Sequence, residues 1–207
     1  GLKVDGAQWI PSAFEKGAVV AICQEKPSFD VPYVTLEDTR MALPVLLSNF
    51  YRHPEKSFDR IIGITGTNGK TTTSFMMKAI FDEAGCKTGL IGTTKYLIGE
   101  EEYPVDKNAA LLTTPDPELL FALFSAMREK GVDTVIMEAS SHALALKKLT
   151  GVPFKIGVFT NFTQDHIDFH KSMEEYLEAK KKLFFVAEEG IFNLDDPAFE
   201  NITKDVS

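Results

Sequence analysis

The most informative segment of the chain is a loop rich in glycine and threonine, which reads Gly63-Ile64-Thr65-Gly66-Thr67-Asn68-Gly69-Lys70-Thr71-Thr72-Thr73. It follows an apolar run and precedes a helical pattern at residues 70–84, which is the strand–loop–helix context of a phosphate-binding loop. Glycines let successive backbone N–H groups point at phosphate oxygens, and the N-terminus of the next helix adds partial positive charge. The spacing differs from G-x-x-x-x-G-K-T, because the first glycine lies one residue earlier and position 64 is Ile.

Two side chains of this loop suit nucleotide chemistry. Lys70 can bridge the β and γ phosphates, and the Thr71 hydroxyl can ligate Mg²⁺. The alternative is a glycine-rich turn that only saves space between a strand and a helix. Gly-Lys-Thr in this context favours the functional interpretation, and we predict an ATP or GTP site.

The rest of the chain from residue 60 onward alternates between strand and helix patterns. Five apolar runs read as strands, at residues 61–64, 89–91, 132–137, 156–159 and 190–194. Helical patterns lie between them, at residues 70–84, 116–130 and 172–186. Continuous apolar strands that alternate with amphipathic helices indicate an α/β fold with a parallel sheet covered on both faces. Residues 95–105 read as a hairpin that departs from this plan.

Residues 1–58 do not follow this regular alternation of strands and helices, which indicates a separate small unit. Short apolar runs at residues 18–22 and 31–35 suit strands, and a helical pattern at residues 36–51 includes Pro44. The polar, proline-containing segment at residues 53–57 reads as a linker. We therefore predict two domains, at residues 1–58 and 59–207.

Composition excludes several classes of protein. The 207 residues carry 22 Lys and Arg against 30 Asp and Glu, a net charge of −8, so a nucleic-acid coat or a polybasic membrane binder is not expected. No apolar run approaches the roughly 18–20 residues that span a bilayer, and no secretory signal is visible. Cys23 and Cys86 lack metal-ligand spacing, which predicts free thiols. We expect a cytoplasmic monomer without nucleic-acid or membrane partners.

A carboxylate follows the strand pattern at residues 132–137. Phosphate-binding loops use such a group, at the carboxyl end of a neighbouring strand, to hold the metal ion, and Glu138 stands at that point. The structural alternative is a carboxylate at a helix N-terminus, satisfied by Ser140, Ser141 and their backbone.

A second polar segment, residues 160–170, follows another strand pattern. His166, Asp168 and His170 cluster there, on what should be the same sheet edge as the phosphate-binding loop. Spacing alone supports a metal-binding role and a structural role about evenly.

The helical pattern at residues 172–186 is amphipathic. Its buried stripe is predicted to contain Met173, Tyr176, Leu177, Leu183 and Phe184. By composition alone the three lysines at positions 180–182 form a solvated run of charge, and nothing in their spacing distinguishes Lys180.

Several motifs together resemble one family. The run at residues 64–73 resembles the ATP loop of the Mur ligases. Further matching motifs are Leu112-Thr113-Thr114-Pro115-Asp116, Glu138-Ala139-Ser140-Ser141-His142-Ala143-Leu144, Thr160-Asn161-Phe162-Thr163-Gln164-Asp165-His166-Ile167-Asp168-Phe169-His170 and Glu178-Ala179-Lys180. This set is similar to the MurE group of the family, which adds a diamino acid to UDP-N-acetylmuramoyl-L-alanyl-D-glutamate.

The resemblance implies ATP-dependent formation of a peptide bond through an acyl phosphate. It assigns ATP to Gly66, Thr67, Asn68, Gly69, Lys70, Thr71 and Thr72. It assigns one Mg²⁺ to Thr71 and Glu138, and a second metal site to His166 with Lys180 carried as a carbamate. A lysine ammonium repels Mg²⁺, whereas its CO₂ adduct is an anionic oxygen ligand. Lys70, Glu138, His166 and Lys180 are thus the expected catalytic residues.

The resemblance also assigns Thr113, Thr114 and Ser140 to the muramoyl-peptide substrate, whose carbonyl and carboxylate groups their hydroxyls can bind as donors. A helix cap at Thr113-Thr114-Pro115 and an ordinary turn at Ser140 would look the same in sequence. The family's substrate-contacting Arg, eight residues after Ser140, is replaced by Lys148. Lysine keeps the charge there but loses the bidentate fork of arginine.

The family has three domains, and the resemblance divides this chain among two of them. It implies that residues 1–58 are the later part of a UDP-substrate-binding domain and residues 59–207 the first part of the ATP-binding domain. The resemblance implies that the C-terminal domain, which binds the amino acid, is not among these 207 residues, so the choice between L-lysine and meso-diaminopimelate stays open. We expect the 207 residues alone to be inactive and to bind nucleotide weakly.

Three alternatives compete with this interpretation. One is a sister ligase (MurC, MurD, MurF or folylpolyglutamate synthetase), against which the Ser-Ser-His-Ala-Leu and Thr-Gln-Asp-His-Ile-Asp-Phe-His runs argue. Another is a nucleotide switch, but no Asn-Lys-x-Asp base-recognition motif is found. The last is a scaffold without activity, which the intact Lys70, Thr71, Glu138, His166 and Lys180 disfavour.

Overall fold

The computed structural model describes residues 5–105, 112–165, 169–204 and 206. The chain divides into two compact units, Gly1–Leu43 and Pro44–Ser207, so the division falls inside helix α2 (Thr39–Phe50). The helix begins after Asp38, whose carboxylate accepts hydrogen bonds from the backbone N–H groups of Arg40 and Met41 (2.9 and 3.3 Å). This cap explains why α2 starts later than the pattern at residues 36–51 predicts.

The first unit is a small α/β structure. It contains the 3₁₀ helix η1 (Gly6–Trp9), helix α1 (Ile10–Glu15) and strands β1 (Ala21–Cys23) and β2 (Tyr33–Thr35), which pair in parallel. Both strands fall on or next to the predicted apolar runs. The assignment of this segment to a UDP-substrate-binding domain stays a prediction.

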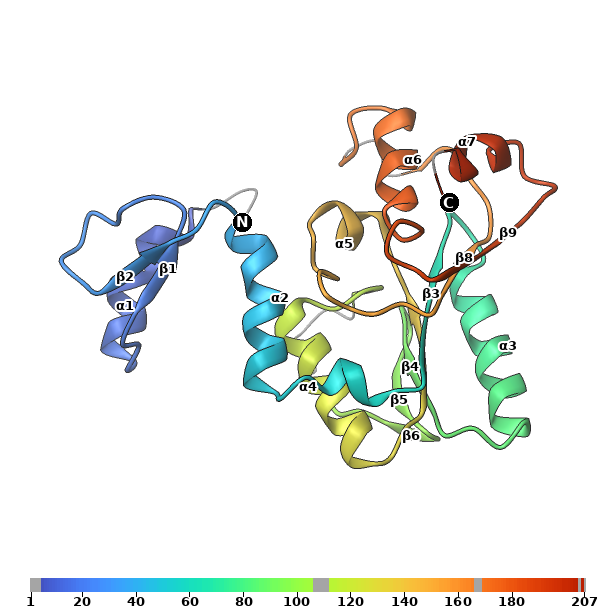
Figure 1. The fold of residues 1–207 in the computed structure, drawn as a ribbon, viewed down its shortest axis with the longest axis horizontal. Helices are drawn as coiled ribbons and strands as arrows, with labels where there is room; N and C mark the ends of the chain where they lie inside the picture. The colour runs from blue at the N-terminus through green and yellow to red at the C-terminus, as the bar shows by residue number, and fades with distance from the viewer. Residues whose placement is uncertain (1–4, 106–111, 166–168, 205, 207) are drawn as a thin grey trace. The chain divides into compact units, whose positions relative to one another are not determined.

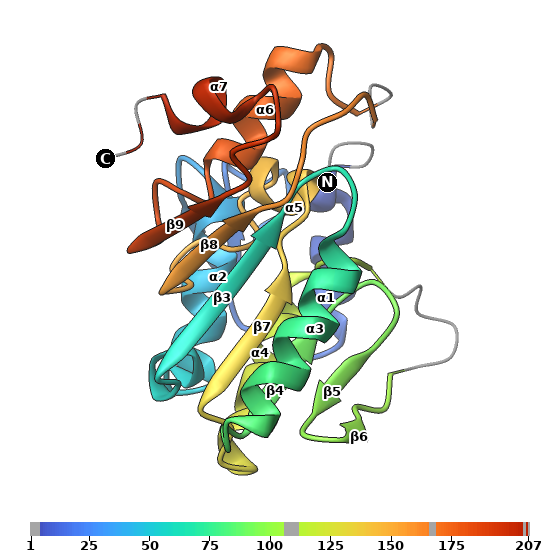
Figure 2. The same cartoon turned by 90° about the vertical axis from the view of Figure 1, so that its right-hand side faces the viewer.

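The second unit is built on one seven-stranded sheet (Figure 2). Its strands are β3 (Arg60–Thr65), β4 (Thr88–Ile91), β5 (Tyr96–Ile98), β6 (Glu101–Glu102), β7 (Thr134–Glu138), β8 (Ile156–Phe159) and β9 (Glu189–Phe192). They lie in the order β6-β5-β4-β7-β3-β8-β9. The five strands from β4 to β9 in this order are parallel, while β5 and β6 form the predicted antiparallel hairpin. The predicted fold class is confirmed.

Helices cover the sheet on both faces (Figure 1). Helices α3 (Lys70–Glu83) and α4 (Pro117–Glu129) lie on opposite faces. Helices α5 (Ser141–Ala145), α6 (Met173–Lys181) and α7 (Phe199–Thr203) lie toward the end of the sheet where β3 and β8 finish (Figure 2). Alternate residues of a strand point to opposite faces. Val135 and Met137 of β7 therefore join the core that contains the buried side of α4, while Ile136 joins the core that contains Met77 and Phe81 of α3.

Two local predictions differ from the structure. The segment at residues 53–57, read as a polar linker, includes the 3₁₀ helix η2 (Pro54–Ser57), in which Pro54 and Glu55 are buried. Helix α6 ends at Lys181, although its pattern continues, and Leu183 and Phe184 are buried in the turn that follows. Burial at these points comes from packing against distant elements, which local periodicity does not report.

Other predictions about the whole chain are tested by the same structure. Cys23 and Cys86 are free thiols, as predicted. Across residues 5–105, 112–165, 169–204 and 206, no helix has the length and apolar character needed to cross a bilayer.

Lys147 has a strained backbone, and its replacement by glycine should stabilise the protein. Its φ is +60°, a left-handed conformation that costs a residue with a Cβ about 1–2 kcal/mol. Glycine adopts it freely but loses roughly 0.5–1 kcal/mol more conformational entropy on folding. We expect Lys147→Gly to raise the free energy of unfolding by about 0.5–1 kcal/mol, measured as a higher urea midpoint. Lys182→Gly is the matched control: φ at Lys182 is −55°, so stability should fall, and equal shifts in both variants would contradict the explanation.

Candidate active site

The phosphate-binding loop lies between β3 and α3, at the edge where the parallel strands end. Strands β7 and β8 flank β3 in the sheet. Residues that follow these strands therefore stand on either side of the loop: Glu138 ends β7, and Thr160 and Asn161 follow β8. Ligands of open α/β sheets bind at this edge.

Two glycines give the loop its path. Gly66 has φ +144° and Gly69 has φ +84°, both in the region that L side chains rarely adopt. Gly69 also caps the N-terminus of α3. A Cβ on Gly66 would lie 1.9 Å from Thr160 Oγ1, so the neighbouring segment leaves no space for a side chain.

The segment after β8 holds the loop in place. The backbone N–H of Thr67 donates to the Asn161 carbonyl (2.8 Å), and that of Asn68 donates to the Asn161 side-chain oxygen (2.9 Å). Thr160 Oγ1 donates to the Asn68 carbonyl (2.7 Å). Thr160 and Asn161 hold the loop in place, and the sequence reasoning did not single them out, although the density of polar groups directly after a strand was a usable signal.

Lys70 bends back over its own loop. Its Nζ donates to the carbonyls of Gly66 and Thr67, both at 2.9 Å. Burial lowers the pKa of Lys70, while the charges of Glu138 and Asp165 act in the opposite direction. The other expected ATP contacts, from Gly66 to Thr72, lie in this loop and in the first turn of α3.

Glu138 is fully buried and held by one residue of a neighbouring strand end. Thr93, just after β4, donates its backbone N–H to Glu138 Oε1 and its hydroxyl to Oε2, each at 3.0 Å. A Cβ on Gly92 would lie 2.4 Å from Oε1, so the close approach requires glycine there. Sequence reasoning missed Thr93, although the strand-end rule that located Glu138 applies equally to the residues after β4.

The residues expected to bind the muramoyl peptide gather beside Glu138. Thr93 Oγ1 lies 3.0 Å from Thr113 Oγ1. Thr114 Oγ1 donates to the Glu138 carbonyl (2.7 Å) and accepts from the Ser140 N–H (2.9 Å). The Ser140 hydroxyl also caps α5, as the structural alternative anticipated.

Lys148 is paired within the protein. Its Nζ lies 2.7 Å from Asp116 Oδ1, and Asp116 stands at the N-terminus of α4 directly after the Thr113-Thr114-Pro115 motif. The pair connects the turn after α5 to that motif. A role for Lys148 in substrate binding stays a prediction.

Lys180 is buried, which its place in a run of three lysines does not reveal. It is 1% exposed and Lys181 is 4% exposed, so the expectation of a solvated charge run is wrong for both; Lys182 alone is exposed. The Lys180 Nζ lies 4.2 Å from the centre of the Tyr176 ring, and the Tyr176 hydroxyl donates to Thr67 in the phosphate-binding loop (3.3 Å).

Burial, and after it the positive charge of Lys70, lower the pKa of Lys180 to about 7, against the opposing charge of Asp165. The two lysines therefore act on one another across the site. An anionic group between or upon them would relieve this repulsion.

The chemistry of the described donors fits Mg²⁺. A hydroxyl and a carboxylate, as at Thr71 and Glu138, are hard oxygen ligands, and Mg²⁺ commonly takes one or two protein ligands with phosphate oxygens and water. Within the described part of the chain, no group of three or more His, Cys, Asp or Glu side chains could hold a metal ion. His166 and Asp168 lie outside the described residues. His170 is 2% exposed and hydrogen-bonded to Ser141 (3.0 Å), in accord with a structural role.

Comparison with known proteins gives a consistent result. A model of the Mur ligase middle domain matches residues 64–207. The chain is 47% identical, over 208 residues, to a UDP-N-acetylmuramoyl-L-alanyl-D-glutamate--2,6-diaminopimelate ligase of Clostridium perfringens; the match covers 100% of this chain and 42% of that protein. The chain thus spans less than half the length of this relative.

Solved structures extend the comparison to the fold. A structure of a UDP-N-acetylmuramoyl-L-alanyl-D-glutamate--2,6-diaminopimelate ligase superposes with TM-score 0.79 at 27% identity, over 96% of this chain and 39% of that one. MurF from Acinetobacter baumannii superposes with TM-score 0.61 at 17% identity, over 99% and 41%, and shows the shared fold alone. The family model covers well over half of the chain and includes the phosphate-binding loop, Glu138 and Lys180, and the chain therefore belongs to the Mur ligase family.

Proposed function

We propose that this chain forms the nucleotide-binding and muramoyl-peptide-binding parts of a ligase that adds a diamino acid to UDP-N-acetylmuramoyl-L-alanyl-D-glutamate. The observation that carries the proposal is the convergence of the phosphate-binding loop, Lys70, Glu138 and Lys180 at one sheet edge, in a chain 47% identical to a protein so named. That name favours 2,6-diaminopimelate as the diamino acid. Because ATP and UDP-linked substrates are cytoplasmic metabolites, we expect the reaction to take place in the cytoplasm, and we expect a monomer.

The reaction would proceed in two steps. The glutamyl side-chain carboxylate attacks the γ-phosphorus of ATP, so that a carboxylate–phosphorus bond forms and ADP leaves. The amine then attacks the acyl carbon, an amide bond forms, and inorganic phosphate and a proton are released. The loop amides and Lys70 would bind the phosphates, and Thr71 and Glu138 would hold Mg²⁺, which neutralises phosphate charge.

Lys180 would serve as a carbamate in this site. A lysine with its pKa near 7 is substantially neutral at physiological pH, and the neutral amine adds CO₂ with formation of an N–C bond and loss of one proton. The product is an anion beside the Lys70 ammonium, which replaces repulsion with attraction. Such an anion would bind metal together with His166.

The carbamate can be detected by labelling with ¹³CO₂. We expect a ¹³C carbamate signal that grows as pH rises through about 7, because the neutral amine is the reactive form; exposed lysines, with pKa values of about 10.4, need higher pH. The signal should vanish in Lys180→Gln and persist in Lys182→Gln, the exposed neighbour. A signal unchanged by Lys180→Gln would exclude this modification.

The activity itself can be tested by phosphate release from the complete protein, given ATP, Mg²⁺ and UDP-N-acetylmuramoyl-dipeptide, with lysine, 2,6-diaminopimelate or no amino acid. We expect release only with the muramoyl substrate and diaminopimelate together. Release with lysine instead would correct the amino acid. Phosphate release that does not depend on UDP-N-acetylmuramoyl-dipeptide would favour a sister ligase (MurC, MurD, MurF or folylpolyglutamate synthetase) or a nucleotide switch.

A further inference from the structure

Thr93 links Thr113 and Glu138, two residues of the site that belong to different sequence motifs. Its hydroxyl lies 3.0 Å from Glu138 Oε2 and 3.0 Å from Thr113 Oγ1, and its backbone N–H lies 3.0 Å from Glu138 Oε1. Glycine at position 92 is what allows this approach, because a Cβ there would meet Oε1 at 2.4 Å. The arrangement is a continuous hydrogen-bonded line from Thr113 through Thr93 to the buried carboxylate.

The direction of each hydrogen bond in this line follows from counting protons. A hydroxyl carries one proton and two lone pairs, whereas a carboxylate, the form that binds a cation, can only accept. The proton of Thr93 therefore goes to Glu138. The contact between Thr93 and Thr113 is then made by the proton of Thr113, and the Thr113 oxygen offers only lone pairs to a ligand.

The same count of protons and lone pairs applies to the hydroxyls of Thr114 and Ser140, but it leaves Ser140 as a donor. The Glu138 carbonyl can only accept, so the Thr114 proton is committed to it at 2.7 Å. Thr114 Oγ1 also receives the Ser140 N–H at 2.9 Å. The Ser140 hydroxyl, 3.1 Å from Thr114 Oγ1, is therefore a donor, and can turn its proton to a ligand while Thr114 keeps a partner.

We propose that Thr113 recognises an amide N–H of the muramoyl-peptide substrate, and that Thr93 is the positioning residue that sets this polarity. This reverses the expectation that Thr113 donates to a carbonyl or carboxylate of the substrate. A substrate carboxylate would meet lone pairs at Thr113 and the negative charge of Glu138 behind them, so it belongs on the side of the Lys70 ammonium. The inference rests on the proposed function and assigns the hydrogen-bonding class of one substrate contact.

The test uses the complete ligase and analogues of UDP-N-acetylmuramoyl-dipeptide. Three analogues each lack one amide N–H, replaced by an ester oxygen at the acetamido group, at the lactoyl–alanine bond or at the alanyl–glutamate bond. We measure kcat and KM for the parent, Thr113→Val and Thr93→Val. Thr113→Val should raise KM for the natural substrate about tenfold, the effect of losing one hydrogen bond.

The decisive comparison is a double-mutant cycle in which one change is made in the protein and the other in the substrate. With the parent enzyme, one of the three analogues should raise KM by the same factor of about ten. With Thr113→Val, that analogue should raise KM no further, because the same hydrogen bond is already missing. Thr93→Val should weaken the sensitivity to that analogue without abolishing it, because Thr113 keeps its lone pairs but its proton loses the partner that directs it away from the substrate. Thr113→Ser and Thr93→Ser keep the hydroxyl and should be as sensitive to the analogue as the parent. Thr94→Val, at the exposed neighbouring residue, should also keep the parent's sensitivity.

The outcomes separate the two proposals. If the parent does not turn over UDP-N-acetylmuramoyl-dipeptide at all, the proposed function fails. If it turns over but the losses from Thr113→Val multiply with those of all three analogues, Thr113 accepts from none of these N–H groups and the polarity inference is overturned.

Discussion

Replacement of Glu138 by glutamine should lower kcat/KM of the complete ligase by about 10²–10³-fold, the range for loss of one preorganised charge-stabilising group. Glutamine has nearly the same volume and keeps both contacts with Thr93, since its oxygen accepts from the backbone N–H and its amide donates to the hydroxyl. The fold should therefore survive while the negative charge at the proposed Mg²⁺ site is lost. The Mg²⁺ concentration needed for half-maximal rate should rise.

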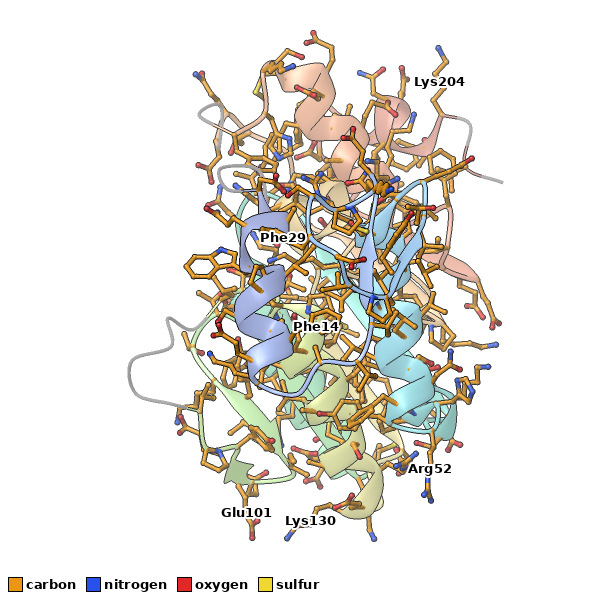
Figure 3. The ribbon with its side chains drawn as sticks, turned by 90° about the vertical axis from the view of Figure 1, so that its left-hand side faces the viewer. Phe14, Phe29, Arg52, Glu101, Lys130 and Lys204 are labelled. Atoms are coloured by element: carbon orange, nitrogen blue, oxygen red, sulfur yellow. The ribbon has the colours of Figure 1, made fainter. Side chains whose placement is uncertain are left out.

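The matched control is Glu101→Gln. Glu101 is an exposed residue of β6 that pairs with Lys130 at 3.6 Å (Figure 3), and β6 lies away from the carboxyl end of β3 (Figure 2). Exposed ion pairs contribute about 0–1 kcal/mol, so this variant should have the parent's kinetics. A Glu138→Gln enzyme with nearly the parent kcat/KM and the parent dependence on Mg²⁺ would contradict the assignment of Glu138.

Replacement of Gly66 by alanine should destabilise the protein and abolish measurable nucleotide binding. The backbone at φ +144° is rarely open to an L side chain, and the added Cβ would lie 1.9 Å from Thr160 Oγ1 and 3.1 Å from the backbone N and O of Asn161. Backbone strain of about 1–2 kcal/mol and overpacking of about 1–3 kcal/mol add to an expected loss of roughly 2–5 kcal/mol. Thermal unfolding and binding of a fluorescent ATP analogue measure the two effects.

Two further variants separate the causes. Gly85 has φ +85°, but nothing lies within 4 Å of the point that a Cβ would occupy there, so Gly85→Ala should show only the strain, about 1–2 kcal/mol. Thr160→Ala removes the atom in closest contact, so Gly66→Ala in that background should recover part of the stability. Equal losses in Gly66→Ala and Gly85→Ala would show that the contact with the segment after β8 is unimportant.

The sequence alone determined the features that depend on neighbours along the chain. The glycine loop, the strand before it and the helix after it follow from one local motif, because glycines, Lys70 and an apolar run need only each other to define a strand–loop–helix unit. Glu138 was located by the rule that functional groups stand at strand ends. The alternation of strands and helices likewise predicted the parallel sheet, and residues 95–105 were recognised as a hairpin because they depart from that alternation.

Only the tertiary structure decided which of these groups meet and which are buried. Thr93 reaches Glu138, and Asn161 reaches the phosphate-binding loop, because the sheet order places β4 and β3 on the two sides of β7 and β8 on the far side of β3. Lys180 and Lys182 look alike in sequence, yet one is buried against Tyr176 and the other is exposed. Burial and hydrogen-bond partners depend on packing between elements that are far apart in the chain. The local sequence pattern that forms each element therefore does not predict them.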